Sequence, residues 1–243
     1  WAVNYLQNCI LSGAINLNRI DVQISLMWLN LFQECVGSWE HHPRFLRIAK
    51  DLGKPNSFLH TASQLIIAKY LIKHGNLVGL SLENNAGEPN PDLYIRGTIT
   101  GRTFLEIKSP RMLQGVNAAP KDLQNIENTV KRTIKDSAGQ INKDRVGGLI
   151  IFASLIDKSA SVKLVESARS WLEVNGAQRS GLAAIIIASA IGGCTRGPNR
   201  SIDQSFGIEF SPFLNPHFVG RNPISLSDQT EPDSRAPLKP DLR

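Results

Sequence analysis

The segment PDLYIRGTITGRTFLEIKSP, residues 91–110, places three charged side chains in a sequence otherwise typical of two β-strands. Asp92 opens the first apolar-patterned run, and Glu106 and Lys108 stand inside the second. Because side chains alternate across a strand, Glu106 and Lys108 must point to the same face. The second strand therefore carries the Glu106 carboxylate and the Lys108 ammonium on one face, and the neighbouring strand carries the Asp92 carboxylate.

A tight hairpin with a two-residue turn at Thr100-Gly101 is expected to join the two strands. In that register Asp92 faces Ser109, the neighbour of Lys108. Two carboxylates and one ammonium would then meet at one end of the hairpin. The alternative is a surface hairpin whose cross-strand ion pair contributes less than about 1 kcal/mol.

Two converging carboxylates can hold a hard divalent cation through oxygen, and a neighbouring lysine can orient or deprotonate a water beside it. Asp92 and Glu106 are the predicted metal ligands, with Lys108 as the lysine beside them. The backbone carbonyl of Ile107 could add an oxygen, because its side chain points into the core. The cluster offers no Cys or His, so Mg²⁺ is preferred over zinc, with Mn²⁺ as a substitute.

Hydrophobic periodicity predicts helices and strands on both sides of the hairpin. The expected helices cover residues 61–74, 121–141 and 162–172, and the expected strands cover 77–82, 146–155, 182–190 and part of 205–214. Gly75 is the expected C-cap of the first helix. The continuous apolar run of 146–155 is typical of a strand buried on both faces, and the segment within 205–214 is expected at an edge of the sheet.

The order Pro91-Asp92, thirteen residues and then Glu106-Ile107-Lys108, with a helix and a strand before it and after it, resembles the PD-(D/E)XK nuclease superfamily. The resemblance implies an α/β fold with a restriction-endonuclease-like αβββαβ core, in which helices flank a mixed central sheet. It also implies a Mg²⁺-dependent phosphodiesterase site. In that site Asp92 and Glu106 match the metal-binding acids and Lys108 matches the catalytic lysine.

The family places a further acid, often Glu, on the helix before the hairpin. Here Gln64 stands at that position, at the family's spacing from Gly75. A glutamine offers a neutral oxygen ligand but no charge, so either the cation binds less tightly or Glu83 serves instead. In some branches the helix after the hairpin also supplies a glutamine, which would be Gln140 here.

The chain is expected to divide into four parts. Residues 1–56 read as a helical accessory region, and 57–193 read as the nuclease-like core. Residues 194–220 would contain the edge strand and a loop. Residues 221–243 have no sustained apolar period and read as a poorly ordered tail.

The chain carries 27 Lys and Arg against 21 Asp and Glu, a net charge of +6. Nine of the basic and five of the acidic residues fall within 102–145, so an excess of +4 surrounds the charged hairpin. Such an excess favours a polyanionic partner. The predicted phosphate contacts are Arg102, Arg111, Lys131 and Lys135, and the alternative is a solvated surface.

Composition also bears on location. The longest apolar runs fall short of the roughly 20 residues that a membrane-spanning helix needs, so no membrane segment is expected. No signal peptide of the basic-then-apolar kind opens the sequence. Three cysteines without a CxxC pair argue against a disulfide framework, and His41, His42 and His60 lack the spaced partners of a zinc site. A reducing cytoplasm is therefore expected.

These features together predict a metal-dependent nuclease that hydrolyses phosphodiester bonds. A DNA endonuclease of restriction or repair type is the first choice, and it could act as a homodimer. A toxin-type RNase that cleaves tRNA is the second, and it would have an acidic immunity protein as partner. The missing helix acid also permits a nucleic-acid-binding module without catalysis. The sequence has neither a GxSxG motif nor a P-loop, which disfavours hydrolases and NTPases built on them.

Overall fold

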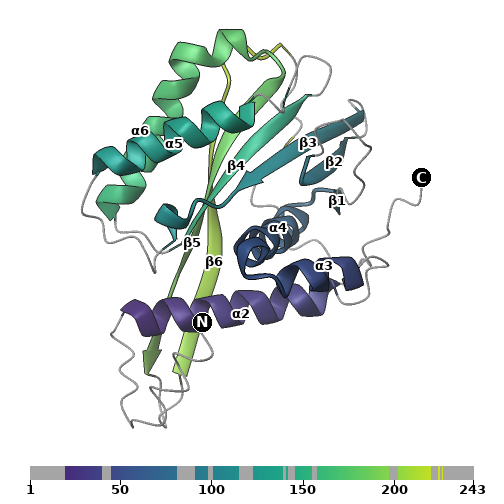
Figure 1. Ribbon diagram of the computed structural model, residues 1–243, viewed down its shortest axis with the longest axis vertical. Helices are drawn as coiled ribbons and strands as arrows, with labels where there is room; N and C mark the ends of the chain where they lie inside the picture. Colours follow the sequence, from purple (N-terminus) through teal and green to yellow (C-terminus); the bar gives the residue numbers. More distant parts are fainter. Residues whose placement is uncertain are drawn as a thin grey trace.

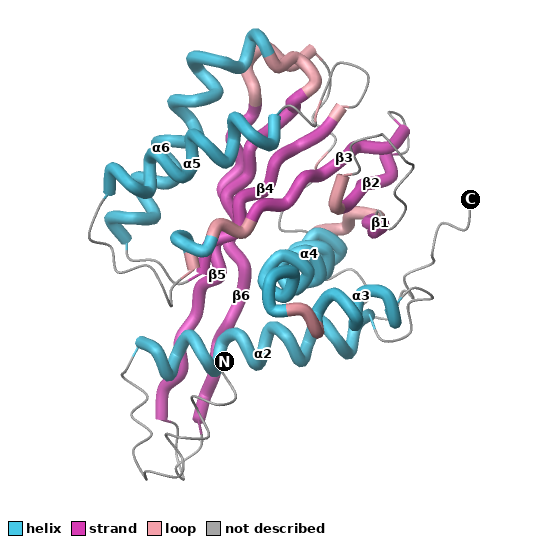
Figure 2. The backbone as a smooth tube through the Cα atoms, viewed as in Figure 1, coloured by secondary structure: helices cyan, strands magenta, loops and turns pink. Residues whose placement is uncertain are grey.

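The computed structural model describes residues 20–39, 45–80, 91–97, 101–114, 123–138, 141, 146–154, 158–196, 202–219, 224 and 226. These residues form an α/β fold in which helices flank a six-stranded mixed sheet. Figures 1 and 2 show helices on both sides of the sheet. The predicted fold class is therefore confirmed at the level of an α/β protein with a mixed sheet.

The strands lie side by side in chain order, from β1 at one edge to β6 at the other. Their bounds are Val78–Leu80 (β1), Leu93–Gly97 (β2), Gly101–Lys108 (β3), Gly147–Ser154 (β4), Leu182–Arg196 (β5) and Ile202–Leu214 (β6). The first three strands are antiparallel to one another, β3, β4 and β5 are parallel, and β6 runs antiparallel to β5. The segment expected at a sheet edge does form an edge strand.

The helices form two layers, with α2, α3 and α4 on one side of the sheet and α5 and α6 on the other (Figure 1). Their bounds are Ile20–Trp39 (α2), Phe45–Leu52 (α3), Pro55–Lys73 (α4), Leu123–Ala138 (α5) and Lys158–Asn175 (α6), with short 3-10 helices at Arg111–Leu113 (η1) and Gly176–Gln178 (η2). The helix before the hairpin, the hairpin itself and the helix after it thus follow the expected order.

Each helix layer has its own hydrophobic core. On the α4 side, Leu65 and Leu71 are buried together with Leu105 of β3. Trp28 of α2 joins this core, and its ring meets that of Phe152 edge-on with centroids 5.8 Å apart. Helix α2 therefore packs against the same sheet as the rest of the described chain.

On the other side, Ile126, Val130 and Ile134 form one stripe of α5 and pack against β4 and α6. These positions recur every four residues, which is a helical spacing and predicted this helix. All eight residues of β4 are buried, as the continuous apolar run indicated. β4 therefore lies between its parallel neighbours β3 and β5 with both of its faces covered.

Helix α4 ends where the sequence indicated and begins earlier. Gly75 has a φ of 80°, which a residue without Cβ adopts at little cost, and it follows the C-cap residue His74. The helix begins at Pro55 rather than near residue 61, because proline fits the first helical turn. The earlier start brings His60 inside the helix.

The hairpin register differs from the expected one. Leu93 pairs with Leu105 and Gly97 pairs with Gly101, so the proposed turn at Thr100-Gly101 is wrong. Residues 98–100 separate the paired ends. The registers differ by an odd number of residues, which changes the face on which every β2 side chain would lie.

The buried face decides between the registers. The expected pairing would have put Leu93 on the face of Glu106 and Lys108, whereas the observed pairing puts it on the face of Leu105, where both are buried. Position 92 therefore lies across from Glu106 rather than from Ser109. In the observed register, position 92 is therefore nearer to Glu106 along the hairpin than the expected register indicated.

Several expectations lie outside the described residues. These are the roles considered for Glu83 and Gln140, the segment 1–19 and most of the tail 221–243. Within the described part of the chain, every helix is too short or too polar to cross a bilayer.

Candidate functional site

Asp92 lies at the end of the β2–β3 hairpin, one residue before β2 begins. Its Oδ2 accepts a hydrogen bond of 2.7 Å from the backbone N–H of Ile107. The carboxylate takes the place of a backbone acceptor at that point of the ladder. It thereby ties the start of β2 to the end of β3.

Pro91 explains why the backbone ladder between β2 and β3 ends beside this contact. In β3 the Phe104 N–H bonds to the Val146 carbonyl on the β4 side, so the odd-numbered residues direct their N–H and C=O groups toward β2. Ile107 is one of them, and the register sets it across from Pro91. Proline has no N–H to donate, so the ladder cannot continue there. The Ile107 carbonyl is left directed toward the Asp92 side of the hairpin.

Glu106 and Lys108 point to one face of β3, as strand alternation requires. The Lys108 ammonium donates a hydrogen bond to Oε1 of Glu106. The Glu106 side chain is 5% exposed and that of Lys108 is 32% exposed. The Lys108 ammonium thus binds a buried carboxylate while part of the lysine side chain is exposed to solvent.

The charge of Asp92 acts on Glu106. Burial raises the pKa of Glu106 above its usual 4.5, because desolvation disfavours the charged carboxylate. The negative charge of Asp92 raises that pKa further, whereas the hydrogen bond and charge of Lys108 lower it. A further cation shared by the two carboxylates would relieve this repulsion.

Helix α4 supplies the other contacts of Asp92. Nε2 of Gln64 donates to Oδ1 of Asp92 over 2.6 Å, and Nε2 of His60 lies 3.1 Å from the same oxygen. His60 and Gln64 are four residues apart, which places them on one face of the helix. The structure therefore brings Gln64 to the site, but with its amide nitrogen rather than its oxygen toward Asp92.

Sequence analysis did not place His60 at the site. The available signal was its spacing of four from Gln64, which puts both side chains over the hairpin once the helix includes residue 60. The hydrogen bond to Asp92 raises the pKa of His60 above its usual 6.5, while burial opposes the rise.

The three contacts among His60, Gln64 and Asp92 cannot all be hydrogen bonds at once. The His60 and Gln64 nitrogens are 2.9 Å apart, in addition to their contacts with Asp92. A ring nitrogen that donates to Asp92 cannot at the same time accept from Gln64. At most two of the three contacts are hydrogen bonds at one time, and the Gln64 bond to the carboxylate is common to both arrangements.

A buried polar pair fixes the loop after β3. Nε2 of Gln114 donates to the Phe152 carbonyl over 3.0 Å, and the Ser154 hydroxyl donates to Oε1 of Gln114 over 2.9 Å. These bonds hold the loop against the end of β4 and so support the position of Lys108. A single glutamine in a loop gives no periodic signal, and sequence analysis missed it.

The predicted phosphate contacts have different surroundings. Arg111 and Lys135 are exposed and form no ion pair within the described residues. Lys131 is exposed but bound to Glu127, which also binds Lys163 of α6. Arg102 belongs to β3, and its side chain lies outside the described residues.

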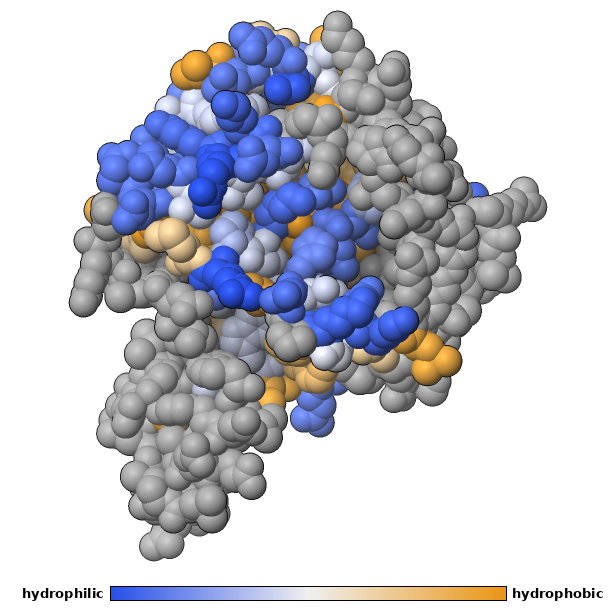
Figure 3. Space-filling model, in the orientation of Figure 1, coloured by the Kyte–Doolittle hydropathy of each residue, from blue (hydrophilic) through white to orange (hydrophobic). Residues whose placement is uncertain are grey.

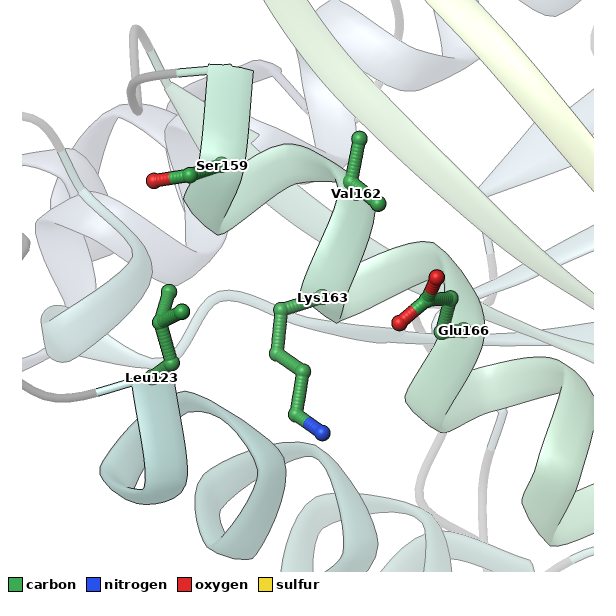
Figure 4. Close-up of a pocket in the computed structure, with 5 residues that line it drawn as sticks. All are labelled: Leu123, Ser159, Val162, Lys163 and Glu166. Atoms are coloured by element: carbon green, nitrogen blue, oxygen red, sulfur yellow. The ribbon is translucent and has the colours of Figure 1, made fainter.

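The surface carries two further features. The outer side of α5 and α6 is predominantly hydrophilic (Figure 3). An open pocket on this layer, at the start of both helices, is lined by Leu123, Ser159, Val162, Lys163 and Glu166 (Figure 4). None of the hairpin residues lines this pocket, so it is separate from the site at Asp92.

The donor set fits a hard cation. Asp92, Glu106 and the Ile107 carbonyl supply oxygens, which Mg²⁺ and Mn²⁺ accept. No group of three His, Cys, Asp or Glu side chains within the described ranges is arranged to hold a metal. Water and substrate would therefore have to complete the coordination, as is usual for Mg²⁺, which keeps several waters.

Comparisons of the chain with protein-family models, with curated proteins and with solved structures find no match. The geometry of the site and the resemblance carried by its residues are therefore the basis for a function.

Proposed function

We propose that this protein is a metal-dependent nuclease that hydrolyses phosphodiester bonds. The observation that carries the proposal is the placement of Asp92, Glu106 and Lys108 together at one end of the β2–β3 hairpin. The element order α4-β1-β2-β3-α5-β4, with β4 parallel to β3, supports a restriction-endonuclease-like core. Both are features of the PD-(D/E)XK resemblance.

Each residue has a role that its surroundings support. Asp92 and Glu106 would hold Mg²⁺ or Mn²⁺ together with the Ile107 carbonyl, and the ion would stabilise negative charge on the phosphate. The Lys108 ammonium is partly exposed beside the carboxylates, where it can orient the attacking water. Gln114 and Ser154 restrict the loop that follows this lysine.

The proposed substrate is DNA, cut by an endonuclease of restriction or repair type, and the second candidate is an RNA such as tRNA. Arg111 and Lys135 have no ion-pair partner in the described part of the chain and are the side chains best able to contact phosphates. Lys131 would have to leave Glu127 or share it.

One observation favours a different class of function, a nucleic-acid-binding module without catalysis. Asp92 accepts hydrogen bonds from Ile107 and Gln64, so both of its oxygens already have partners. A site satisfied by its own donors can fold without a cation. The module would bind nucleic acid through the same basic surface and cut none.

A cleavage assay separates the candidates. Plasmid, single-stranded DNA and tRNA are incubated with the wild-type protein, with Lys108→Ala and with Lys50→Ala, each with Mg²⁺ or Mn²⁺. Lys50 is an exposed lysine of α3 and is the matched control. The nuclease proposal expects Lys108→Ala to lose about 100-fold or more of the cleavage rate and Lys50→Ala to retain it.

The outcomes are distinct. The substrate that wild type cuts fastest identifies the branch. Binding to nucleic acid with no cutting by any variant would favour the module. Equal cutting by wild type and Lys108→Ala would remove the lysine from the mechanism and contradict the proposal.

A further inference from the structure

We propose that Gln64 is a latch on Asp92, a positioning residue that competes with the cation instead of binding it. This inference rests on the proposed function, because it concerns the same cation site. It differs from the role that the resemblance gives this position, which is an oxygen ligand. The contacts of the Gln64 amide carry the argument.

The amide nitrogen of Gln64 is the atom in contact. It lies 2.6 Å from Oδ1 of Asp92, shorter than the usual 2.9 to 3.0 Å of an N–H···O bond, and bonds to charged acceptors are the shorter ones. The amide oxygen could not stand in its place, because two acceptors would then face each other. Gln64 therefore offers the site a donor.

The choice of glutamine has a physical reason in this site. Asp92 and Glu106 already repel each other. A glutamate at position 64 would add a third negative charge beside Asp92, at a cost to the cation-free protein. A glutamine of nearly the same shape supplies a hydrogen bond instead, so the site is stable without a cation.

The same bond must weaken cation binding. Oδ2 of Asp92 is held by the Ile107 N–H, and Oδ1 is contacted by both Gln64 and His60. Since an oxygen has two lone pairs, a cation that uses Oδ1 competes with the amide for it. The net contribution of a hydrogen bond to a charged group corresponds to about tenfold or more in affinity. Removal of the latch should therefore tighten cation binding by about tenfold or more.

The test is a titration with Mn²⁺ alone, followed by electron paramagnetic resonance of the free ion. Four proteins are compared, namely wild type, Gln64→Met, Gln124→Met and Asp92→Asn. Methionine matches the length of glutamine without a donor, and Gln124 is a helix glutamine of α5 that bonds one turn ahead to Asn128. We expect Gln64→Met to bind Mn²⁺ more tightly by about tenfold or more, Gln124→Met to match wild type and Asp92→Asn to lose the site.

Weaker or unchanged binding by Gln64→Met would overturn the latch and leave the cation site standing. Binding by Gln64→Met but not by wild type would support a latch strong enough to close the site. No binding by either protein would overturn both the latch and the cation site of the proposed function. Circular dichroism shows whether each variant is folded.

A second measurement uses wild type alone and so does not depend on the variants. The side-chain amide signals of Gln64 are followed by NMR during addition of Mg²⁺. A latch predicts that they move toward the positions of a solvated glutamine as the bond to Asp92 is lost. If Mg²⁺ binds while these signals remain at the positions of the cation-free protein, the Gln64 amide has not left Asp92, which would contradict the latch.

Discussion

At Glu106, stability and the proposed chemistry oppose each other. The Glu106 side chain is 5% exposed, and burial followed by the charge of Asp92 raises the pKa of its carboxyl above 4.5. A raised pKa in the folded state means that the favourable contribution of this group is complete below pH 4.5 and is lost as the pH rises through the folded pKa. Retaining a charged Glu106 at neutral pH therefore costs stability.

The change Glu106→Gln should stabilise the cation-free protein. At pH 8 the thermal midpoint is expected to exceed that of wild type by a few degrees, because a neutral amide avoids the desolvation of a charge and still accepts from Lys108. Below pH 4.5 the two midpoints should converge. Calorimetric scans from pH 4 to 8 measure this, and a wild type that is the more stable at pH 8 would contradict it.

At the scale of elements, periodic patterns were sufficient for most helices and strands. Ile126, Val130 and Ile134 predicted α5 because burial on one face imposes their spacing, and the apolar run of β4 predicted its full burial. The hairpin register was not predicted because the Thr100-Gly101 turn motif and the buried side chain of Leu93 favour different registers. His60 and Gln114 were missed because their contacts join segments far apart in sequence.

A charge cluster joins the two helices of one layer. Glu127 of α5 accepts from Lys131 and from Lys163 of α6, each over 2.5 Å, and these bonds lower the pKa of Glu127 to about 2. A lowered pKa gives stability that is present above pH 4.5 and is lost as the pH falls toward 2. The pairs lie at the surface, so salt and solvent weaken them.

The change Glu127→Gln should therefore lower the thermal midpoint slightly at pH 7 and not at all near pH 2. Thermal unfolding of both proteins between pH 2 and 7 at low salt measures this difference. A gap that stays constant down to pH 2 would show that the cluster does not contribute through the charge of Glu127.

At the scale of the whole molecule, the two helix layers differ in what they contact and expose. The α4 layer reaches the hairpin through His60 and Gln64, while the α5 and α6 layer presents a hydrophilic outer surface (Figure 3). Asp92 lies where the hairpin meets α4, and Glu106 points away from the buried face of Leu105. The account depends on both carboxylates being able to reach one ion from these positions.

Crystals soaked in Mn²⁺ and measured near its absorption edge test this claim most directly. The account predicts an anomalous peak about 2 Å from oxygens of both Asp92 and Glu106 and from the Ile107 carbonyl. A fully soaked crystal with no peak there, or with Mn²⁺ bound only at other surfaces, would contradict it.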